Sequence, residues 1–214
     1  MTLIENDTRV RAARGIAKTE TQAAIEAFEQ LKRRGHPRSP PPLISDGWGG
    51  YEEAMVEVWG KVPEYKGRGR PPTNKKAQAG WQYLQMVKHR ENGRVIGVKP
   101  KTIHGDEQEI RQLLGESTSY VERSNLTSRH MNARLVRKTL GYSKELEMLV
   151  ASSIWEDAIY NLGRALKTLR IESPEAAVVG RWKKRSPAMA AGLTDHVWEI
   201  EELLTTLPLP STNS

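Results

Sequence analysis

The sequence predicts a mixed α/β protein in which helices cover a small β-sheet. One observation is the order of the expected elements, which runs from two strands through a helix, a strand and a helix to a hairpin and further helices. Another is the helical spacing of apolar residues in several segments. The third is an Asn-Gly pair between two alternating runs, which is a strong short-range signal for a β-hairpin.

The first sixty residues are expected to hold three short strands and two helices. A turn at residues 5–7 separates the first two strands. Thr19 or Thr21 can cap the first helix, and the last turn of that helix holds three basic residues, where the helix dipole favours them. The expected elements are strands at 3–4 and 10–17, a helix at 19–34, a strand at 42–46 and a helix at 51–59.

The rest of the chain is expected to be a hairpin followed mainly by helices. A basic Gly/Pro-rich loop at 61–79 precedes the hairpin. Ser143 is the expected cap of the longest helix, in which leucines recur at helical spacing. The expected elements are strands at 81–90 and 94–104, helices at 106–114, 119–139 and 143–170, and a tail made of a linker, a short helical element and a last amphipathic helix.

Positive charge is concentrated in two blocks. The 214-residue chain has a formal net charge of +7 and a pI of about 9.6. Residues 61–104 hold 11 Lys/Arg against 2 Glu, and residues 121–144 hold 6 Lys/Arg against Glu122 alone. Two cationic blocks on a more acidic remainder favour a polyanionic partner such as nucleic acid. The alternative is a solvated cationic face without a partner.

Composition narrows the classes of protein that remain. There is no cysteine, which excludes disulfides, thiol catalysis and cysteine-ligated zinc. Neither a secretory signal nor an apolar run of membrane-spanning length is recognisable in the sequence. We therefore expect a cytoplasmic protein without a membrane partner.

Two carboxylates are candidate metal ligands. Asp46 ends a short apolar strand, and ligand chemistry in α/β sheets collects at the carboxyl ends of strands. Glu122 lies in the first turn of a basic helix, and Mg²⁺ is bound by carboxylates together with substrate phosphates. Each has a simpler interpretation, because an Asp before Gly commonly forms a turn and a Glu among arginines is commonly an ion-pair member.

Three stretches carry a resemblance to a known family. They are LISDGWGGYEEAM, YVERSNLTSRHMNARLVRKTLGYSK and RSPAMAAGLTDHVWEIEELL. Together and in this order, they resemble DDE-type transposases of insertion sequences, and more narrowly the insertion-sequence-one-like branch. The resemblance extends from about Leu3 to Leu204 and implies a ribonuclease H-like sheet over 1–171, with 61–104 as an insertion and 172–214 as a linker and helical tail.

The resemblance also implies a chemistry. It assigns Asp46 and Glu122 as the second and third members of an Asp-Asp-Glu set that would bind two Mg²⁺ ions, with Mn²⁺ as a substitute. Such ions stabilise the attacking and leaving oxygens in phosphodiester cleavage. The implied activity is cleavage at transposon ends and strand transfer into target DNA, by a nucleoid-associated protein that self-associates.

The family's first Asp has no counterpart in this sequence. Its strand would precede the one at residues 3–4, and the early acids Glu5 and Asp7 fall in a turn. We therefore expect an N-terminally truncated transposase that is defective as it stands. Two alternatives are a DNA-binding remnant or regulator without catalysis, and a related metal-dependent nuclease without strand transfer.

Basic residues of both blocks are the expected DNA contacts. The stretch KGRGRPP resembles an AT-hook core, in which two arginines enter a narrow minor groove. A mobile basic loop that contacts phosphates is the alternative. The candidate DNA-binding residues are Arg68, Arg70, Lys75, Lys76, Arg123, Asn125, Arg129, Arg134, Arg137 and Lys138.

Tryptophan and histidine supply the remaining candidates. Trp48, just after Asp46, is a candidate for stacking on a displaced base. Trp182 and two other late tryptophans are expected to pack the C-terminal helices onto the sheet. His196 is expected to be a cap or a packing residue in the tail motif.

Overall fold

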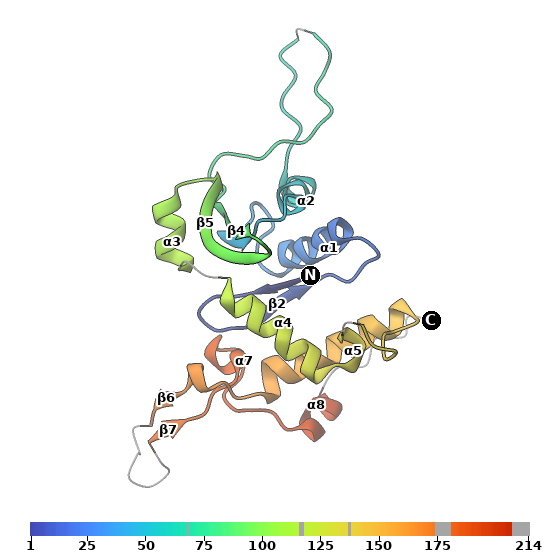
Figure 1. Ribbon diagram of the computed structural model, residues 1–214, viewed down its shortest axis with the longest axis vertical. Coiled ribbons are helices and arrows are strands. Elements are labelled where there is room, and N and C mark those ends of the chain that lie inside the picture. The colour runs from blue at the N-terminus through green and yellow to red at the C-terminus, as the bar shows by residue number, and fades with distance from the viewer. Residues whose placement is uncertain (68, 116–117, 137, 174–180, 207–214) are drawn as a thin grey trace. The chain divides into compact units, whose positions relative to one another are not determined.

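The chain folds as a mixed α/β structure (Figure 1). The computed structural model describes residues 1–67, 69–115, 118–136, 138–173 and 181–206. They form two compact units: unit 1 comprises Met1–Leu3 and Ala12–Ser124, and unit 2 comprises Ile4–Arg11 and Asn125–Ser214. The domain boundary predicted at 171/172 differs from this division and stays a prediction.

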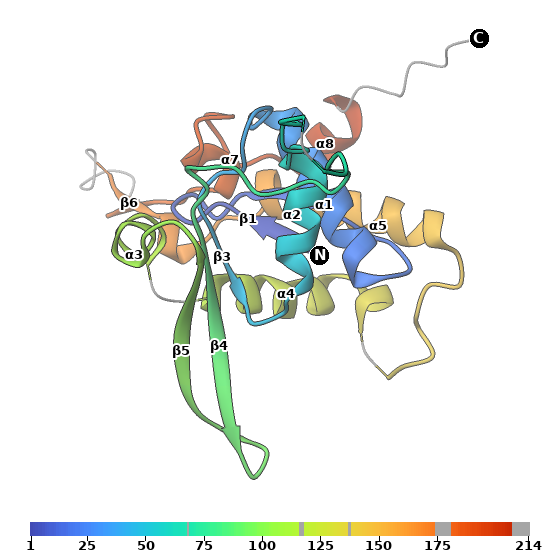
Figure 2. The same ribbon diagram turned by 90° about the horizontal axis from the view of Figure 1, so that it is seen from above.

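Unit 1 contains a three-stranded mixed sheet. The strands β3 (Leu43–Asp46), β4 (Tyr83–Glu91) and β5 (Arg94–His104) lie in the order β3-β4-β5. β3 pairs with β4 in parallel, and β4 pairs with β5 antiparallel. Figure 2 shows β4 and β5 extending together beyond the end of β3. The strand ending at Asp46 and the hairpin were both predicted correctly.

The turn of the hairpin explains why its prediction succeeded. Asn92 and Gly93 both have positive φ, at 47° and 79°. A two-residue turn of this kind matches the twist of the strands on either side and favours Asn-Gly. The signal is local, so the sequence alone was sufficient.

The helices of unit 1 bury apolar faces. α1 (Glu20–Arg34) begins at Thr19, whose side chain accepts a hydrogen bond from the Gln22 N–H. α1 packs against α2 (Gly50–Trp59), and the Phe28 and Trp59 rings lie 5.6 Å apart between centroids. α3 (Glu107–Leu114) is capped by Asp106. The main core consists of Ala13, Ala24, Phe28, Leu31, Ala54, Met55, Trp59, Trp81 and Tyr83.

The N-terminal hairpin was also predicted, although its second strand is shorter than expected. β1 (Thr2–Ile4) and β2 (Arg11–Arg14) form a two-stranded sheet. Glu5 and Asp7 lie in the intervening turn, where the Glu5 carboxylate accepts hydrogen bonds from the backbone N–H groups of Asp7 and Thr8. The Glu5 side chain therefore serves to close this turn.

The helix predicted at 119–139 is shorter in the structure. α4 (Ser119–Met131) ends before Asn132, whose backbone is extended, with φ −126° and ψ 104°. The Asn132 side chain accepts a hydrogen bond from the Arg134 N–H and caps a short 3₁₀ turn at Ala133–Leu135. Asn is a poor interior helix residue for this reason, since its side chain competes for backbone groups.

The helix predicted at 143–170 is likewise divided. α5 (Leu146–Ala158) begins after Glu145, and the Ser143 hydroxyl donates to the Glu145 carbonyl instead of capping the helix. A π-helical turn at Ile159–Gly163 follows α5. The chain then becomes extended at Arg164, so the leucine pattern was longer than the helix that it predicted.

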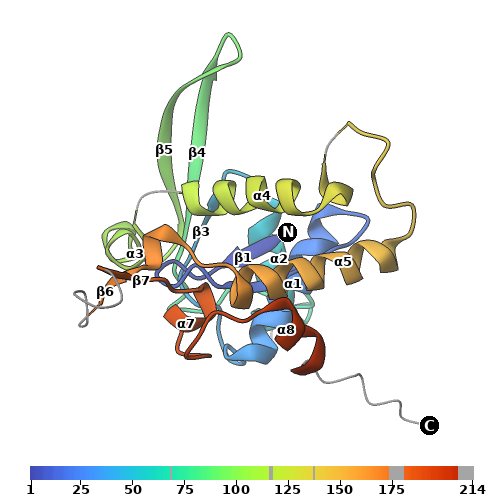
Figure 3. The ribbon, with the colours of Figure 1, turned by 90° about the horizontal axis from the view of Figure 1, so that it is seen from below.

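The tail of unit 2 contains an element that the sequence analysis missed. β6 (Ile171–Glu172) and β7 (Trp182–Lys183) pair antiparallel where a linker was expected. The two predicted helical elements are present as α7 (Pro187–Ala190) and α8 (Ile200–Thr206), and both pack against the π-helical turn after α5 (Figure 3).

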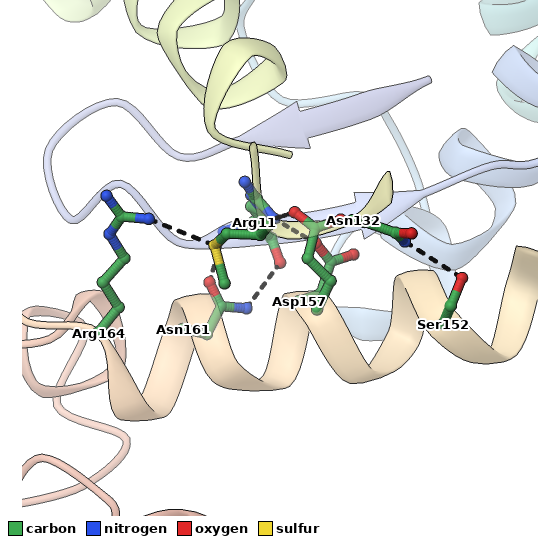
Figure 4. A network of polar contacts seen from close by, with 8 residues as sticks. Arg11, Asn132, Ser152, Asp157, Asn161 and Arg164 are labelled. Atoms are coloured by element: carbon green, nitrogen blue, oxygen red, sulfur yellow. Dashed lines mark hydrogen bonds and ion pairs between the residues drawn. The ribbon is translucent and has the colours of Figure 1, made fainter. Parts of the chain in front are cut away.

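A buried arginine organises unit 2 (Figure 4). The Arg11 side chain is fully buried, and its Nη1 lies 2.5 Å from a Glu156 carboxylate oxygen and 2.9 Å from one of Asp157. Its guanidinium carbon lies 3.8 Å from the centroid of the Tyr160 ring. Asn161 accepts a hydrogen bond from the Arg11 N–H and donates one to the Arg11 carbonyl. One residue thus ties the N-terminal segment to α5 and the turn after it.

We expect Arg11→Met to lower the free energy of unfolding by about 3–5 kcal/mol, because it removes the cation beside the buried Glu156 and the half-buried Asp157. Urea denaturation would measure this loss. Adding Glu156→Gln to Arg11→Met should restore part of it by removing one buried charge. The control Arg33→Met changes an exposed arginine and should stay within about 0.5 kcal/mol of the wild type. Equal losses in both arginine variants would contradict the role given to Arg11.

Candidate functional site

Asp46 lies exposed at the carboxyl end of β3. The parallel register places it beside Met86 of β4. Its Oδ1 accepts a hydrogen bond of 3.3 Å from the Trp48 N–H, so Asp46 does form the turn that was the simpler interpretation. The turn leaves carboxylate oxygen available to a further ligand, since each oxygen has more than one lone pair.

A hydrogen-bonded network fixes the backbone on both sides of Asp46. The buried Gln85 amide donates to the Trp48 carbonyl at 3.0 Å and to the Tyr83 hydroxyl at 2.9 Å. The Tyr83 hydroxyl is 2.8 Å from that of Ser45, which donates to the Asp46 carbonyl at 2.7 Å. Gln85 therefore reaches both ends of the Asp46–Trp48 turn and holds it in one conformation.

Tyr51 lies in the electrostatic field of Asp46. Burial, followed by the nearby negative charge of Asp46, raises the pKa of Tyr51 to about 12. Its ring meets the Trp48 ring edge to face, with 4.6 Å between centroids. Trp48 is half-buried and packs against the core of unit 1. Its ring thus serves packing in this structure, and base stacking by Trp48 stays a prediction.

Glu122 is paired with a strand residue. It lies exposed in the first turn of α4, and its carboxylate forms an ion pair with the Lys88 ammonium of β4. The ion-pair interpretation is thus correct in kind, although the partner is Lys88 and not an arginine of the same helix. The Lys88 side chain is 36% exposed and that of Glu122 is 55% exposed, so the pair contributes only about 0–1 kcal/mol to the free energy of unfolding.

The sheet register brings both candidate carboxylates to the same end of β3. Asp46 faces Met86, and Lys88 follows two residues further along β4, on the same side of the strand as Met86. Glu122 bonds to Lys88. Two carboxylates from distant parts of the sequence therefore flank one short segment of β4.

Two carboxylates are fewer than the three that the predicted metal site requires. Across the described ranges, no group of three or more His, Asp or Glu side chains could hold a metal ion. Carboxylate oxygens suit Mg²⁺ chemically, and Mg²⁺ commonly takes only one or two carboxylates, its other ligands being water and substrate phosphate. The described residues do not supply the third carboxylate of an Asp-Asp-Glu set.

Most of the predicted DNA-binding residues on and after α4 are accessible. Arg123 and Asn125 are exposed on α4, and Lys138 is exposed with a positive φ of 57°. Arg129 and Arg134 are half-buried. Arg137 and Arg68 lie outside the described residues.

The predicted contacts in the 61–79 loop differ in their surroundings. Arg70 is exposed, whereas the Lys75 ammonium lies 2.6 Å from a Glu57 carboxylate oxygen. Lys76 forms an isolated antiparallel bridge with Lys61 that closes the base of the loop. Lys75 is therefore already paired, whereas Arg70 and Lys76 are exposed, since the bridge uses only the backbone of Lys76.

Sequence reasoning missed Lys88 and Gln85. Lys88 was counted only as one of many charges, and its pairing with Glu122 depends on tertiary structure. Gln85 did carry a signal, because it is a polar residue in the otherwise apolar run LQMV of a buried strand. Buried polar groups are almost always hydrogen-bonded, so such a residue indicates a network.

His196 is held by two carboxylates. Its Nδ1 is 2.6 Å from Asp195 Oδ1, its Nε2 is 2.8 Å from Glu202 Oε1, and its ring stacks on Trp198. The hydrogen bond to Asp195, then that to Glu202, raises the pKa of His196 above its ordinary value. His196 thus joins the loop before α8 to α8 itself.

Comparison of this chain with protein-family models, with curated proteins and with solved structures finds no match. Among the residues that the structure describes, no helix is long and apolar enough to cross a membrane.

Replacing Gln85 by Leu should lower the free energy of unfolding by about 1–3 kcal/mol, because the carbonyl of the half-buried Trp48 loses its Gln85 donor. Chemical denaturation gives the loss, and amide NMR shifts of residues 46–48 report the turn. Gln82→Leu is the matched control, since the Gln82 amide donates to Glu109 at the surface. If both variants lose the same stability and leave these shifts unchanged, Gln85 does not hold the turn.

The raised pKa of His196 predicts a pH dependence. Protonated His196 stabilises the fold, so its contribution is complete below pH 6.5 and is lost as the pH rises through the higher folded-state pKa. NMR titration of the imidazole should give a pKa above 6.5 in the wild type and a lower one in Asp195→Asn. An imidazole that titrates identically in both proteins would rule out the Asp195 contact.

Proposed function

We propose that this chain is a DNA-binding protein of the DDE transposase type, with a ribonuclease H-like sheet. Asp46 and Glu122 would bind Mg²⁺ at the carboxyl end of β3 and act on DNA phosphodiesters. The observation that carries the proposal is the convergence of these two residues. Both were singled out from separate sequence motifs, and both flank the same segment of β4.

The surroundings of the two carboxylates suit a phosphate-bearing ligand. Lys88 places a cation beside Glu122, and the next residue of α4, Arg123, is exposed. Phosphate contacts by such residues hold a DNA strand without reading its sequence. Gln85 and its partners keep the Asp46 turn in place, which reduces the reorganisation required when a ligand binds.

A bound Mg²⁺ ion would polarise the phosphoryl oxygen and stabilise the developing charge on the oxygens around phosphorus. Asp46 and Glu122 would supply two of its oxygen ligands. Lys88 would then release Glu122 and turn toward the phosphate. Because the pair is exposed and weak, this exchange costs little.

A second function is favoured by a specific observation. The described residues do not supply a third carboxylate, and the Glu122 carboxylate is occupied by a lysine. Both features fit a chain that binds DNA without cutting it, as a remnant or regulator of a full-length enzyme. The two functions share the DNA-binding surface and differ in the role of Asp46 and Glu122.

Glu122→Gln and Asp46→Asn should each reduce Mg²⁺-dependent cleavage of duplex DNA by roughly 100-fold or more. The loss of a metal ligand weakens transition-state stabilisation by several kcal/mol, and about 1.36 kcal/mol corresponds to a tenfold change in rate. Both variants should also weaken Mn²⁺ binding, measured by calorimetry, while DNA affinity in EDTA is retained. A labelled 3′-hydroxyl end would show whether cleavage is followed by joining.

Glu91→Gln is the matched control, since Glu91 is an exposed carboxylate at the far end of β4. It should change neither cleavage nor Mn²⁺ binding. DNA binding without cleavage and without Mn²⁺ binding in the wild type would favour the non-catalytic function. Cleavage that survives in both Asp46→Asn and Glu122→Gln would show that the metal assignment is wrong.

A further inference from the structure

Unit 2 contains a third basic block that the overall charge conceals. Between residues 164 and 185 the sequence holds seven Lys/Arg and two Glu, a local balance of +5. The acidic residues around it had hidden this excess. The cations of this block are Arg164, Lys167, Arg170, Arg181, Lys183, Lys184 and Arg185.

These cations surround the two-stranded ribbon of β6 and β7. Ile171 pairs with Lys183 and Glu172 with Trp182. Beyond the strands, the Leu166 N–H donates to the Arg185 carbonyl at 3.0 Å, which fixes the base of the ribbon. Successive residues of a strand point to opposite faces, so Trp182 and Lys183 lie on opposite faces of the ribbon.

Trp182 does not pack in a core, contrary to the sequence-based expectation. It is 42% exposed. The Arg170 guanidinium carbon lies 4.3 Å from the centroid of its ring, and that of Arg181 lies 5.2 Å away. The ring therefore serves as a platform that positions two guanidinium groups at the surface.

The charges of the ribbon are only partly neutralised. Arg181 pairs with Glu172 at 3.0 Å through two strongly exposed side chains. Lys167, Lys183 and Lys184 are exposed, and none of them makes an ion pair with any residue that the structure describes, although Lys183 lies in the electrostatic field of Asp195. Lys183 and Lys184 thus face solvent in and just after β7, while Lys167 and the stacked Arg170 lie in the segment that leads into β6.

We propose that the β6–β7 ribbon is a second DNA-binding surface, which contacts the phosphate backbone of duplex DNA. A two-stranded ribbon has dimensions that a DNA groove admits, and its cations would reach the phosphates on either side. Each phosphate contact releases counterions, so binding through this ribbon depends steeply on salt. The choice of DNA as the ligand rests on the proposed function, whereas the surface belongs to unit 2 and lies apart from Asp46 and Glu122 in the chain.

The test is the affinity of the full chain for a fluorescein-labelled 30-base-pair duplex, measured by anisotropy at several KCl concentrations in EDTA. Lys183→Gln/Lys184→Gln should weaken binding roughly 10-fold or more at about 100 mM salt and reduce the slope of log affinity against log salt by about 2. The control Lys18→Gln/Arg33→Gln removes the same charge from exposed positions outside the three blocks and should leave the slope unchanged.

The role of the ring is tested separately. Trp182→Leu should weaken DNA binding about 2- to 5-fold, because the stacked guanidinium groups lose the aromatic ring beneath them. Trp182→Phe keeps an aromatic ring and should retain most of the wild-type affinity. Circular dichroism of all variants checks that they are folded. Phe and Leu variants with the same affinity would show that stacking has no part in binding.

The outcomes separate this proposal from that of cleavage. If wild-type protein binds the duplex but the ribbon and control variants have equal slopes, the ribbon is not a DNA surface, whatever the cleavage assay shows. If the ribbon variants lose affinity for vesicles of anionic lipid and not for DNA, the partner is a membrane and the proposal is wrong. If the ribbon result holds and cleavage is absent, only the catalytic proposal fails.

Discussion

The position of β4 between β3 and β5 is the constraint on which unit 1 depends. Its residues serve two purposes, because the first part of the strand is buried and its end is exposed. Tyr83 and Gln85 are buried and hold the turn at Asp46, whereas Lys88 reaches the Glu122 carboxylate. A slip of one residue in the parallel register would exchange Tyr83 and Gln85 with Leu84 and Met86, which are buried on the other face of the strand, so the core and the candidate site stabilise the same register.

Two ion pairs show how differently charge acts in the two units. Arg11 is fully buried among carboxylates and a tyrosine ring, so removing it leaves uncompensated charge in a dry environment. The Lys88–Glu122 pair is exposed and contributes little to stability. A weak pair can be exchanged for another ligand, and this exchange is what a site that binds metal and phosphate requires. The strong pair is structural, and the weak one is a candidate for function.

The sequence was sufficient where the signal is local. The Thr19 cap, the Asn92-Gly93 turn and the strand that ends at Asp46 each depend on a few neighbouring residues, and all three were found. The prediction was wrong where a helical pattern continued past the helix itself. Asn132 ends α4 because its side chain bonds to the backbone of the next turn. The π-helical turn after α5 packs against α7 and α8, and such long-range contacts are not reported by periodicity.

The sequence by itself determined the fold class, the two large basic blocks and the choice of Asp46 and Glu122 as carboxylates of interest. Only the tertiary structure decided what those side chains meet, because strand register and long-range pairing bring together residues that are distant in the chain. It supplied Lys88 as the partner of Glu122 and the Gln85 network behind Asp46. Trp182 was expected in a core, but the structure places it on an exposed ribbon, where the pairing of β6 with β7 brings arginines over its ring.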